Sequence, residues 1–241
     1  MVRLADVAAH RYSASEGIQP VSIFRSVQAR SAAEPRLASG LLGKIFGLLA
    51  FSLAFATVGG YVGAQLGSGW LLPLFIVEIA LIFAVQAMRE REGINMALLY
   101  AFAFVSGATI GPIVAAYVSA GAGGVVLQAV AVTGTMTVGL SAYALTTKRD
   151  LAGIRPYLFM AVLGLFVAMI VNIFVGGSAL FGVISWLGAL IFSALLVVDV
   201  NRAKYAPDTM GNAVVLTLGI YLDIVNLFLF ILRILGGGFR R

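Results

Sequence analysis

The sequence predicts an all-α integral membrane protein with seven transmembrane helices, and three observations support this fold class. The chain of 241 residues is 61% hydrophobic and 11% charged, whereas soluble domains contain roughly 45–50% apolar and 25% charged residues. It contains successive apolar runs that each approach the ~20 residues needed to span a bilayer. These runs lack the two-residue alternation of membrane β-strands, so we expect helices.

Taken in order, the predicted helices are separated by short connections that are rich in glycine or charged residues. The runs cover residues 41–66, 70–88, 94–119, 125–146, 157–175, 180–198 and 213–235. Residues 1–40 are mixed and weakly polar, and we expect a mobile cytoplasmic tail there. Residues 41–236 would then form the membrane domain, and residues 237–241 a short C-terminal tail.

Two features of the apolar runs predict how they pack and how they are oriented. Gly59, Gly63 and Gly67 recur every four residues, a spacing that lets helices approach closely. The connections after runs two, four and six carry Arg89 and Arg91, Lys148 and Arg149, and Arg202 and Lys204, whereas those after runs one, three and five carry no Lys or Arg. The positive-inside rule therefore predicts a cytoplasmic N-terminus, cytoplasmic even-numbered loops and an external C-terminus.

Several classes of function are excluded by composition. The net charge of +6 is expected from membrane orientation and anionic lipids, so we predict no nucleic-acid partner. The chain has no cysteine, and its one histidine, His10, lies in the tail, which excludes thiolate metal sites and embedded histidine chemistry. An intramembrane aspartyl protease is disfavoured because the residues before Asp223 do not form Gly-x-Gly-Asp. We expect no enzymatic activity and no tightly bound cofactor.

Ionisable residues inside the apolar runs are the candidate functional residues, because a charge within a bilayer is costly. Asp223 lies in the middle of the last run, with Asn226 three positions later on the same helical face. Glu78 lies within the second run, and Arg89 ends it on the same face, eleven residues later. Asp199 closes the sixth run. For Asp199 and Arg89, an ordinary interfacial role and a functional role are equally open.

The depth of the two aspartates can be estimated from the rise of ~1.5 Å per helical residue. Arg89 and Asp199 both lie ~28 Å from the outer ends of their runs, at the inner mouth. Asp223 lies ~15 Å below the inner surface, so straight helices would separate the aspartates by ~13 Å in depth. Helix tilt, or a last helix that starts below the surface, would be needed to bring them together.

Four blocks of the sequence resemble the Bax inhibitor-1 family, also called the transmembrane BAX inhibitor motif family, and its bacterial branch in particular. The resemblance covers about residues 41–236. The blocks are Val77-Glu78-Ile79-Ala80 with Met88-Arg89, Tyr100-Ala101-Phe102-Ala103-Phe104-Val105-Ser106-Gly107, Val198-Asp199-Val200-Asn201, and Tyr221-Leu222-Asp223-Ile224-Val225-Asn226-Leu227-Phe228.

The resemblance implies six helices around a central seventh, and a pH-sensitive calcium leak in the bacterial inner membrane. It implies that Asp199 and Asp223 form a hydrogen-bonded pair that senses pH and contacts Ca²⁺ weakly and transiently. It also implies that Arg89 latches onto this pair in the closed state, and that Glu78 and Arg233 form a second ion pair nearer the outside. Asn226 would be a supporting polar residue.

Physical chemistry supports a proton switch independently of the resemblance. Two carboxylates that lie close together in a low dielectric cannot both ionise cheaply, so the pair titrates as a unit. A doubly ionised pair needs a cation, which an arginine or a passing Ca²⁺ can supply. Together with the calcium leak that the resemblance implies, the expected partners are the lipid bilayer and calcium ions, with calcium as the permeant ion.

One alternative function remains open because of the N-terminal tail. Another bacterial branch of the family uses a cytoplasmic tail to bind and restrain a membrane-bound ATP-dependent protease. The tail of some forty residues is longer than a leak channel needs. The alternative is therefore a non-catalytic regulator whose protease partner binds residues 1–40.

Overall fold

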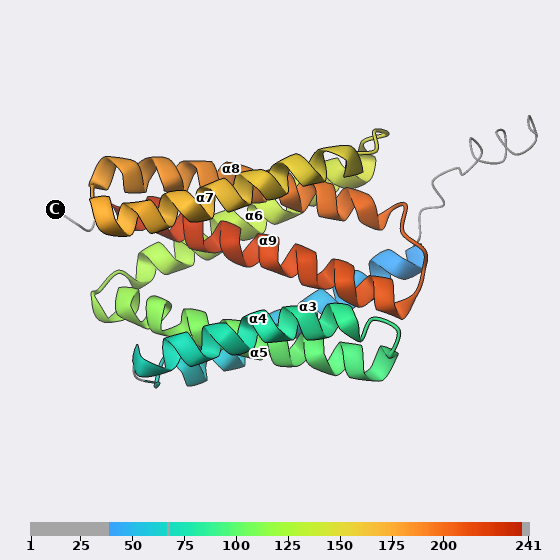
Figure 1. Cartoon of the computed structure of the whole chain (residues 1–241), viewed down its shortest axis with the longest axis horizontal. Helices are drawn as coiled ribbons and strands as arrows, with labels where there is room; N and C mark the ends of the chain where they lie inside the picture. The colour runs from blue at the N-terminus through green and yellow to red at the C-terminus, as the bar shows by residue number, and fades with distance from the viewer. Residues whose placement is uncertain (1–38, 67, 238–241) are drawn as a thin grey trace, which may run out of the picture. The chain divides into compact units, whose positions relative to one another are not determined.

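The computed structural model describes residues 39–66 and 68–237, so the predicted tail lies almost wholly outside the described residues. Over these ranges the chain forms seven α-helices and no strand, and Figure 1 shows how the helices are arranged. The helices are α3 (Ser39–Gly63), α4 (Leu71–Ala87), α5 (Glu92–Ser119), α6 (Gly123–Thr146), α7 (Arg155–Val175), α8 (Ser178–Ala203) and α9 (Met210–Gly236). Two 3-10 turns, η1 (Ser68–Trp70) and η2 (Ala152–Ile154), precede α4 and α7.

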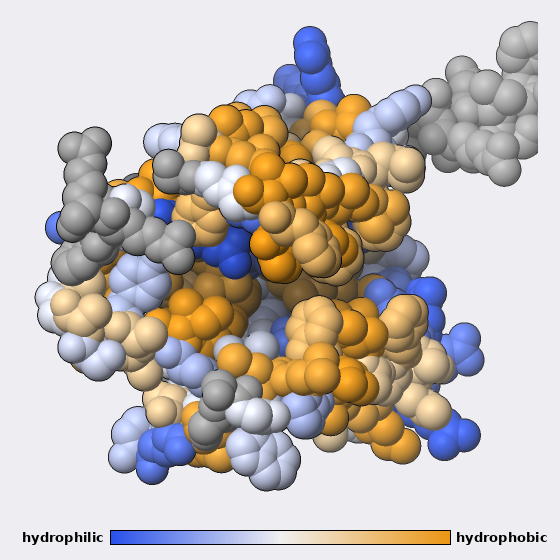
Figure 2. Space-filling model, turned by 60° about the vertical axis from the view of Figure 1, so that its left-hand side comes forward, coloured by the Kyte–Doolittle hydropathy of each residue, from blue (hydrophilic) through white to orange (hydrophobic). Residues whose placement is uncertain are grey.

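The seven-helix membrane fold predicted from the sequence is confirmed. Six of the helices are long and apolar enough to cross a membrane. The exception is α4, whose 17 residues correspond to ~25 Å by helical rise, at the short end of what can span a bilayer. Figure 2 shows hydrophobic residues over much of one face, with hydrophilic residues gathered mainly toward its edges.

The last helix, α9, lies at the centre of the helix arrangement. It packs against α3, α4, α5, α6 and α8. Figure 1 shows it running obliquely between the group formed by α3, α4 and α5 and the pair formed by α7 and α8. Of its membrane-crossing stretch 56% is buried, compared with 6% for the stretch that contains α7. Thus α9 is the core element, whereas α7 packs mainly on α8 and exposes most of its surface.

Glycines bring α3 and α5 into close contact. A Cβ atom added to Gly59 or Gly63 would collide with the backbone of α5, and one added to Gly107 or Gly111 would collide with the backbone of α3. Small residues four apart on both helices therefore let the two backbones touch. The packing role predicted for Gly59 and Gly63 is confirmed, whereas Gly67 lies outside the described residues.

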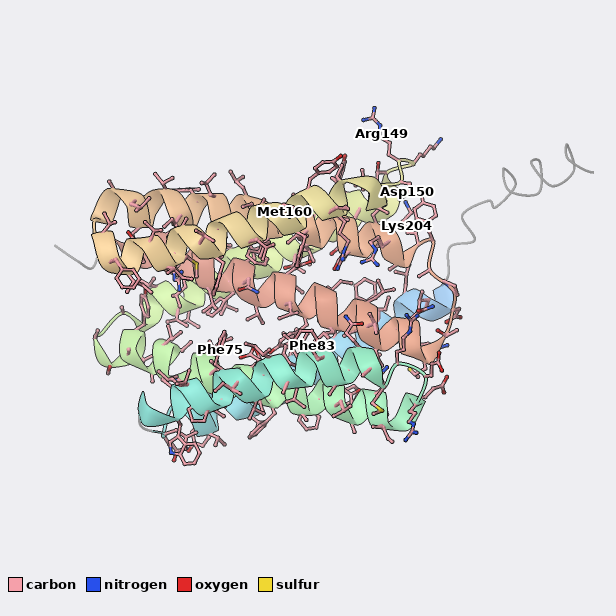
Figure 3. All side chains as sticks on the ribbon, viewed as in Figure 1. Phe75, Phe83, Arg149, Asp150, Met160 and Lys204 are labelled. Carbon is pink, nitrogen blue, oxygen red and sulfur yellow. The ribbon has the colours of Figure 1, made fainter. Side chains whose placement is uncertain are left out.

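Polar side chains near the C-terminal end of α8 hold the end of α6 and the loop that leads to α7. Asn201 donates from Nδ2 to the carbonyl oxygens of Ala144, at 3.2 Å, and Arg149, at 3.1 Å. The Lys204 ammonium also donates to the carbonyl of Ala144. Figure 3 shows Lys204, Arg149 and Asp150 at the same end of the helices. The bonds to Ala144 satisfy a carbonyl in the last turn of α6, and the bond to Arg149 holds the loop that leads to α7.

Candidate functional site

An ion pair joins the start of α7 to the end of α8. The Nε of Arg155, the first residue of α7, donates to Oδ1 of Asp199 at 2.9 Å. Arg202, one turn beyond Asp199, donates from Nη1 to the same oxygen at 3.1 Å. Asp199 is buried, whereas the Arg155 side chain is 44% exposed. The two arginines together compensate a carboxylate that would be costly to bury alone.

Asp223 lies in the same cavity as this ion pair. The cavity, of about 350 Å³, lies between α7, α8 and α9, and its polar wall includes Arg155, Asp199 and Asp223. The rest of the wall is largely apolar and includes Phe159, Val162, Phe166, Phe192, Leu195 and Phe230. Asp223 is only 5% exposed, and its Oδ2 has no hydrogen-bond partner among the described residues. Buried carboxylate oxygens normally have partners, so this one is exceptional.

The predicted depth offset of ~13 Å between the aspartates, from helical rise, is wrong. A Cβ atom on Gly219 would contact the Asp199 carboxylate, so Asp199 lies level with Gly219. Asp223 follows one turn later on α9, ~6 Å further along the axis. The helix also starts at Met210, three residues before the predicted run. The structure brings both aspartates into one cavity, although no hydrogen bond joins their carboxyl groups.

Arg89 does not contact the aspartates in this structure, contrary to the expected latch. Its Nη2 donates to Oδ1 of Asn212 at 3.1 Å, at the beginning of α9. Gly211 lies directly against the backbone of Arg89, which holds the end of α4 beside the start of α9. Arg89 is therefore held at that helix end, while Arg155 occupies the position beside Asp199.

Glu78 and Arg233, predicted to form a second ion pair, are not brought together either. Glu78 lies near Ser106 on α5 and Tyr221 on α9. Arg233 lies twelve residues beyond Tyr221, ~18 Å further along α9 by helical rise. Its guanidinium instead stacks over the Phe230 ring, with 5.4 Å between its Cζ and the ring centroid. The length of α9 thus separates the two charges.

The remaining predicted residue, Asn226, lines the cavity but bonds within its own helix. Its Nδ2 donates to the carbonyl oxygen of Leu222 at 2.8 Å. Over the described ranges, no three His, Cys, Asp or Glu side chains gather where they could hold a metal ion. Calcium prefers six to eight oxygen ligands, so the two aspartates could contact a calcium ion only weakly. That contact stays a prediction.

The sequence reasoning missed Arg155, although a simple signal was present. Gly177, in the turn between α7 and α8, lies 22 residues after Arg155 and 22 residues before Asp199. In an antiparallel helical hairpin, residues equally far from the turn lie at the same level because the rise per residue is constant. This counting would have placed the arginine beside the aspartate.

Comparison with known proteins identifies the family. The profile described as "Inhibitor of apoptosis-promoting Bax1" matches residues 38–241, which is most of the chain. The chain belongs to the Bax inhibitor-1 family. The cavity that contains Asp199 and Asp223 therefore occurs in a member of this family.

Several bacterial proteins are similar to this chain over most of their length. An uncharacterized protein of Campylobacter jejuni is 34% identical over 199 residues, covering 78% of this chain and 84% of its own. An uncharacterized membrane protein of Vibrio cholerae is 30% identical and covers 81% and 88%. The inner membrane protein YbhL of Escherichia coli is 30% identical and covers 69% and 74%. By this similarity the chain is a multi-pass inner-membrane protein, whose orientation stays a prediction.

Proposed function

We propose that this Bax inhibitor-1 family protein lets calcium ions leak passively across the bacterial inner membrane, and that Asp199 and Asp223 make the leak depend on pH. The observation that carries the proposal is the shared cavity: two buried acids from neighbouring helices, one held by arginines and one with an unpartnered oxygen. Such a site changes its charge when protons or cations arrive.

The closed state is the arrangement in which Arg155 holds Asp199. Protonation of the acids removes the charge that holds the arginine, so this contact should loosen as pH falls. The helix that carries Arg155, α7, has the least buried membrane-crossing stretch, and it is therefore the element that moves most easily. Protonation also removes oxygen ligands for calcium, so conduction at very low pH should be limited by weak ion binding.

The proposal is tested by measuring calcium flux into proteoliposomes over a pH series. Asp223→Asn should flatten the pH dependence, because one member of the coupled pair no longer titrates. Asp208→Asn is a matched control, because this carboxylate lies outside the cavity and pairs with Lys44 at 2.9 Å. A wild-type chain without calcium flux at any pH, or an Asp223→Asn variant with the wild-type profile, would contradict the proposal.

The same assay separates the leak from the tail-dependent alternative. A chain without residues 1–38 should keep the wild-type flux, because the cavity lies wholly within residues 155–230. If calcium flux were absent with and without the tail, and removing the tail abolished the protein's effect on a membrane protease, the regulator that binds a membrane protease would be the better assignment.

A further inference from the structure

The cavity between α7, α8 and α9 has the features of a binding site for an organic ligand, beyond its place in a proton switch. Each helix contributes residues from one face: on α7 these include Arg155, Phe159, Val162 and Phe166, which follow one another at spacings of three and four. The volume of about 350 Å³ falls in the range of small-molecule pockets, ~300–1,000 Å³.

The cavity is polar at one end and apolar along the rest of its length. Arg155, Asp199 and Asp223 form the polar end, near the start of α7 and the C-terminal end of α8. Beyond Asp223 the α9 wall continues to Phe230, seven residues or ~10 Å further by helical rise. Apolar residues from all three helices line this stretch. An apolar wall of this kind does not favour water.

The charges at the polar end favour a cation. Asp199 already accepts from Arg155 and Arg202, whereas Oδ2 of Asp223 is buried and accepts no hydrogen bond. An ammonium group supplies three donors and a positive charge, and four phenylalanine rings line the path beyond it, Phe159, Phe166, Phe192 and Phe230. Aromatic rings accommodate both an apolar chain and a nearby cation.

We propose that this cavity binds a single-chain apolar amine, with its ammonium on Asp223 and its chain along the apolar wall toward Phe230. A phospholipid is a poorer occupant, because its phosphate would lie beside the carboxylates, and the nearest guanidinium, that of Arg155, is already bonded to Asp199. The proposal does not depend on whether the chain conducts calcium, because binding is measured directly.

The test uses the full chain in phosphatidylcholine nanodiscs, with octylammonium as the probe and octanol as the neutral probe of equal chain length. Affinity is read from the rise in the unfolding temperature with probe concentration. Octylammonium should bind the wild type about tenfold more tightly than octanol, the difference expected for one charge-assisted hydrogen bond. Asp223→Asn should abolish this preference and leave octanol binding unchanged.

A matched pair of variants on α7 locates the site. Val162 lines the cavity, whereas Val167 does not and is 57% exposed. Val162→Trp should fill the cavity and remove saturable binding of both probes, and Val167→Trp should bind as the wild type does. If Val162→Trp does not fold, Leu195→Phe fills the cavity from α8 instead.

Four results would overturn the proposal. Equal affinity for the two probes in the wild type, or a preference that survives Asp223→Asn, would show that the ammonium is not bound by this carboxylate. Equal binding by the cavity-filling variant and Val167→Trp would indicate partition into lipid only. Weaker octylammonium binding in phosphatidylethanolamine nanodiscs would show that a lipid headgroup competes, and would make that lipid the occupant. Calcium flux measured separately would leave each of these conclusions unchanged.

Discussion

The two sides of α9 differ in how closely their helices pack, although both are apolar. On one side, α3 and α5 meet backbone to backbone through glycines. On the other, α7 and α8 enclose with α9 a cavity walled by phenylalanines and three charged residues. Burial sets α7 apart from the others, with 6% of its candidate membrane span buried, against 28% for α3, 39% for α5 and 44% for α8. The α3–α5 side therefore acts as a frame, and α7 is the part of the other side that can change.

The largest expected effect is on the frame. In Gly107→Leu the new side chain would meet the backbone of α3, which cannot move aside as a side chain could. We expect a loss of about 3 kcal/mol in the free energy of unfolding, the upper end for overpacking. Gly164→Leu on α7 is the matched control, because no atom lies near its added Cβ. Denaturant unfolding in detergent measures the free energy of unfolding of both variants. Equal losses would show that the two sides of α9 do not differ in how closely their helices pack.

The next effect concerns the arginine that closes the cavity. Arg155→Ala leaves the buried Asp199 with Arg202 alone, and because Arg155 is partly exposed we expect a cost of about 1–3 kcal/mol, below that of a fully buried pair. The closed state should become less stable, so calcium flux at a given pH should rise. Arg89→Ala removes a bond to Asn212 instead, and it should raise flux less. A larger rise with Arg89→Ala would favour the latch that the family resemblance implies.

A smaller and more selective effect is expected for the two aspartates as a coupled pair. Asp199→Asn and Asp223→Asn should each flatten the dependence of calcium flux on pH, and the double substitution should add little, because the pair titrates as one unit. Flux over a pH series in proteoliposomes measures the slope for all four proteins. Independent, additive slopes would show that the aspartates share a cavity without sharing protons.

Most of the fold could be predicted because hydrophobic length is a direct consequence of bilayer thickness. Helix starts were predicted to within three residues, but α8 extends five residues beyond the predicted end at Val198. The cause is that a run of apolar residues marks the part of a helix inside the membrane, whereas the helix itself continues. Asp199, Asn201 and Arg202 thus lie on α8 and not in a loop.

The candidate site was predicted only in part, because a single sequence gives positions along helices but not the contacts between them. Asp199 and Asp223 line one cavity, and their role as a pair stays a prediction, because their separation depends on where α9 starts and how it crosses α8. The family resemblance implies that Arg89 pairs with the aspartates and that Glu78 pairs with Arg233. In this structure neither of these pairs is in contact. Arg155 was overlooked although its level in the α7–α8 hairpin could be counted from Gly177.

The smallest expected effect concerns an ion pair outside the cavity. Lys44 of α3 and Asp208, just before α9, pair at 2.9 Å, but their side chains are 38% and 45% exposed. Water and salt screen such charges, so Asp208→Asn should cost less than about 1 kcal/mol. Asp199→Asn, the same chemical change, leaves two arginines facing a neutral amide and should cost more. Thermal unfolding of both variants at low and high salt checks this. The loss of stability in Asp208→Asn should vanish at high salt, and that in Asp199→Asn should remain. The reverse order would mean that burial in the cavity does not govern the strength of these ion pairs.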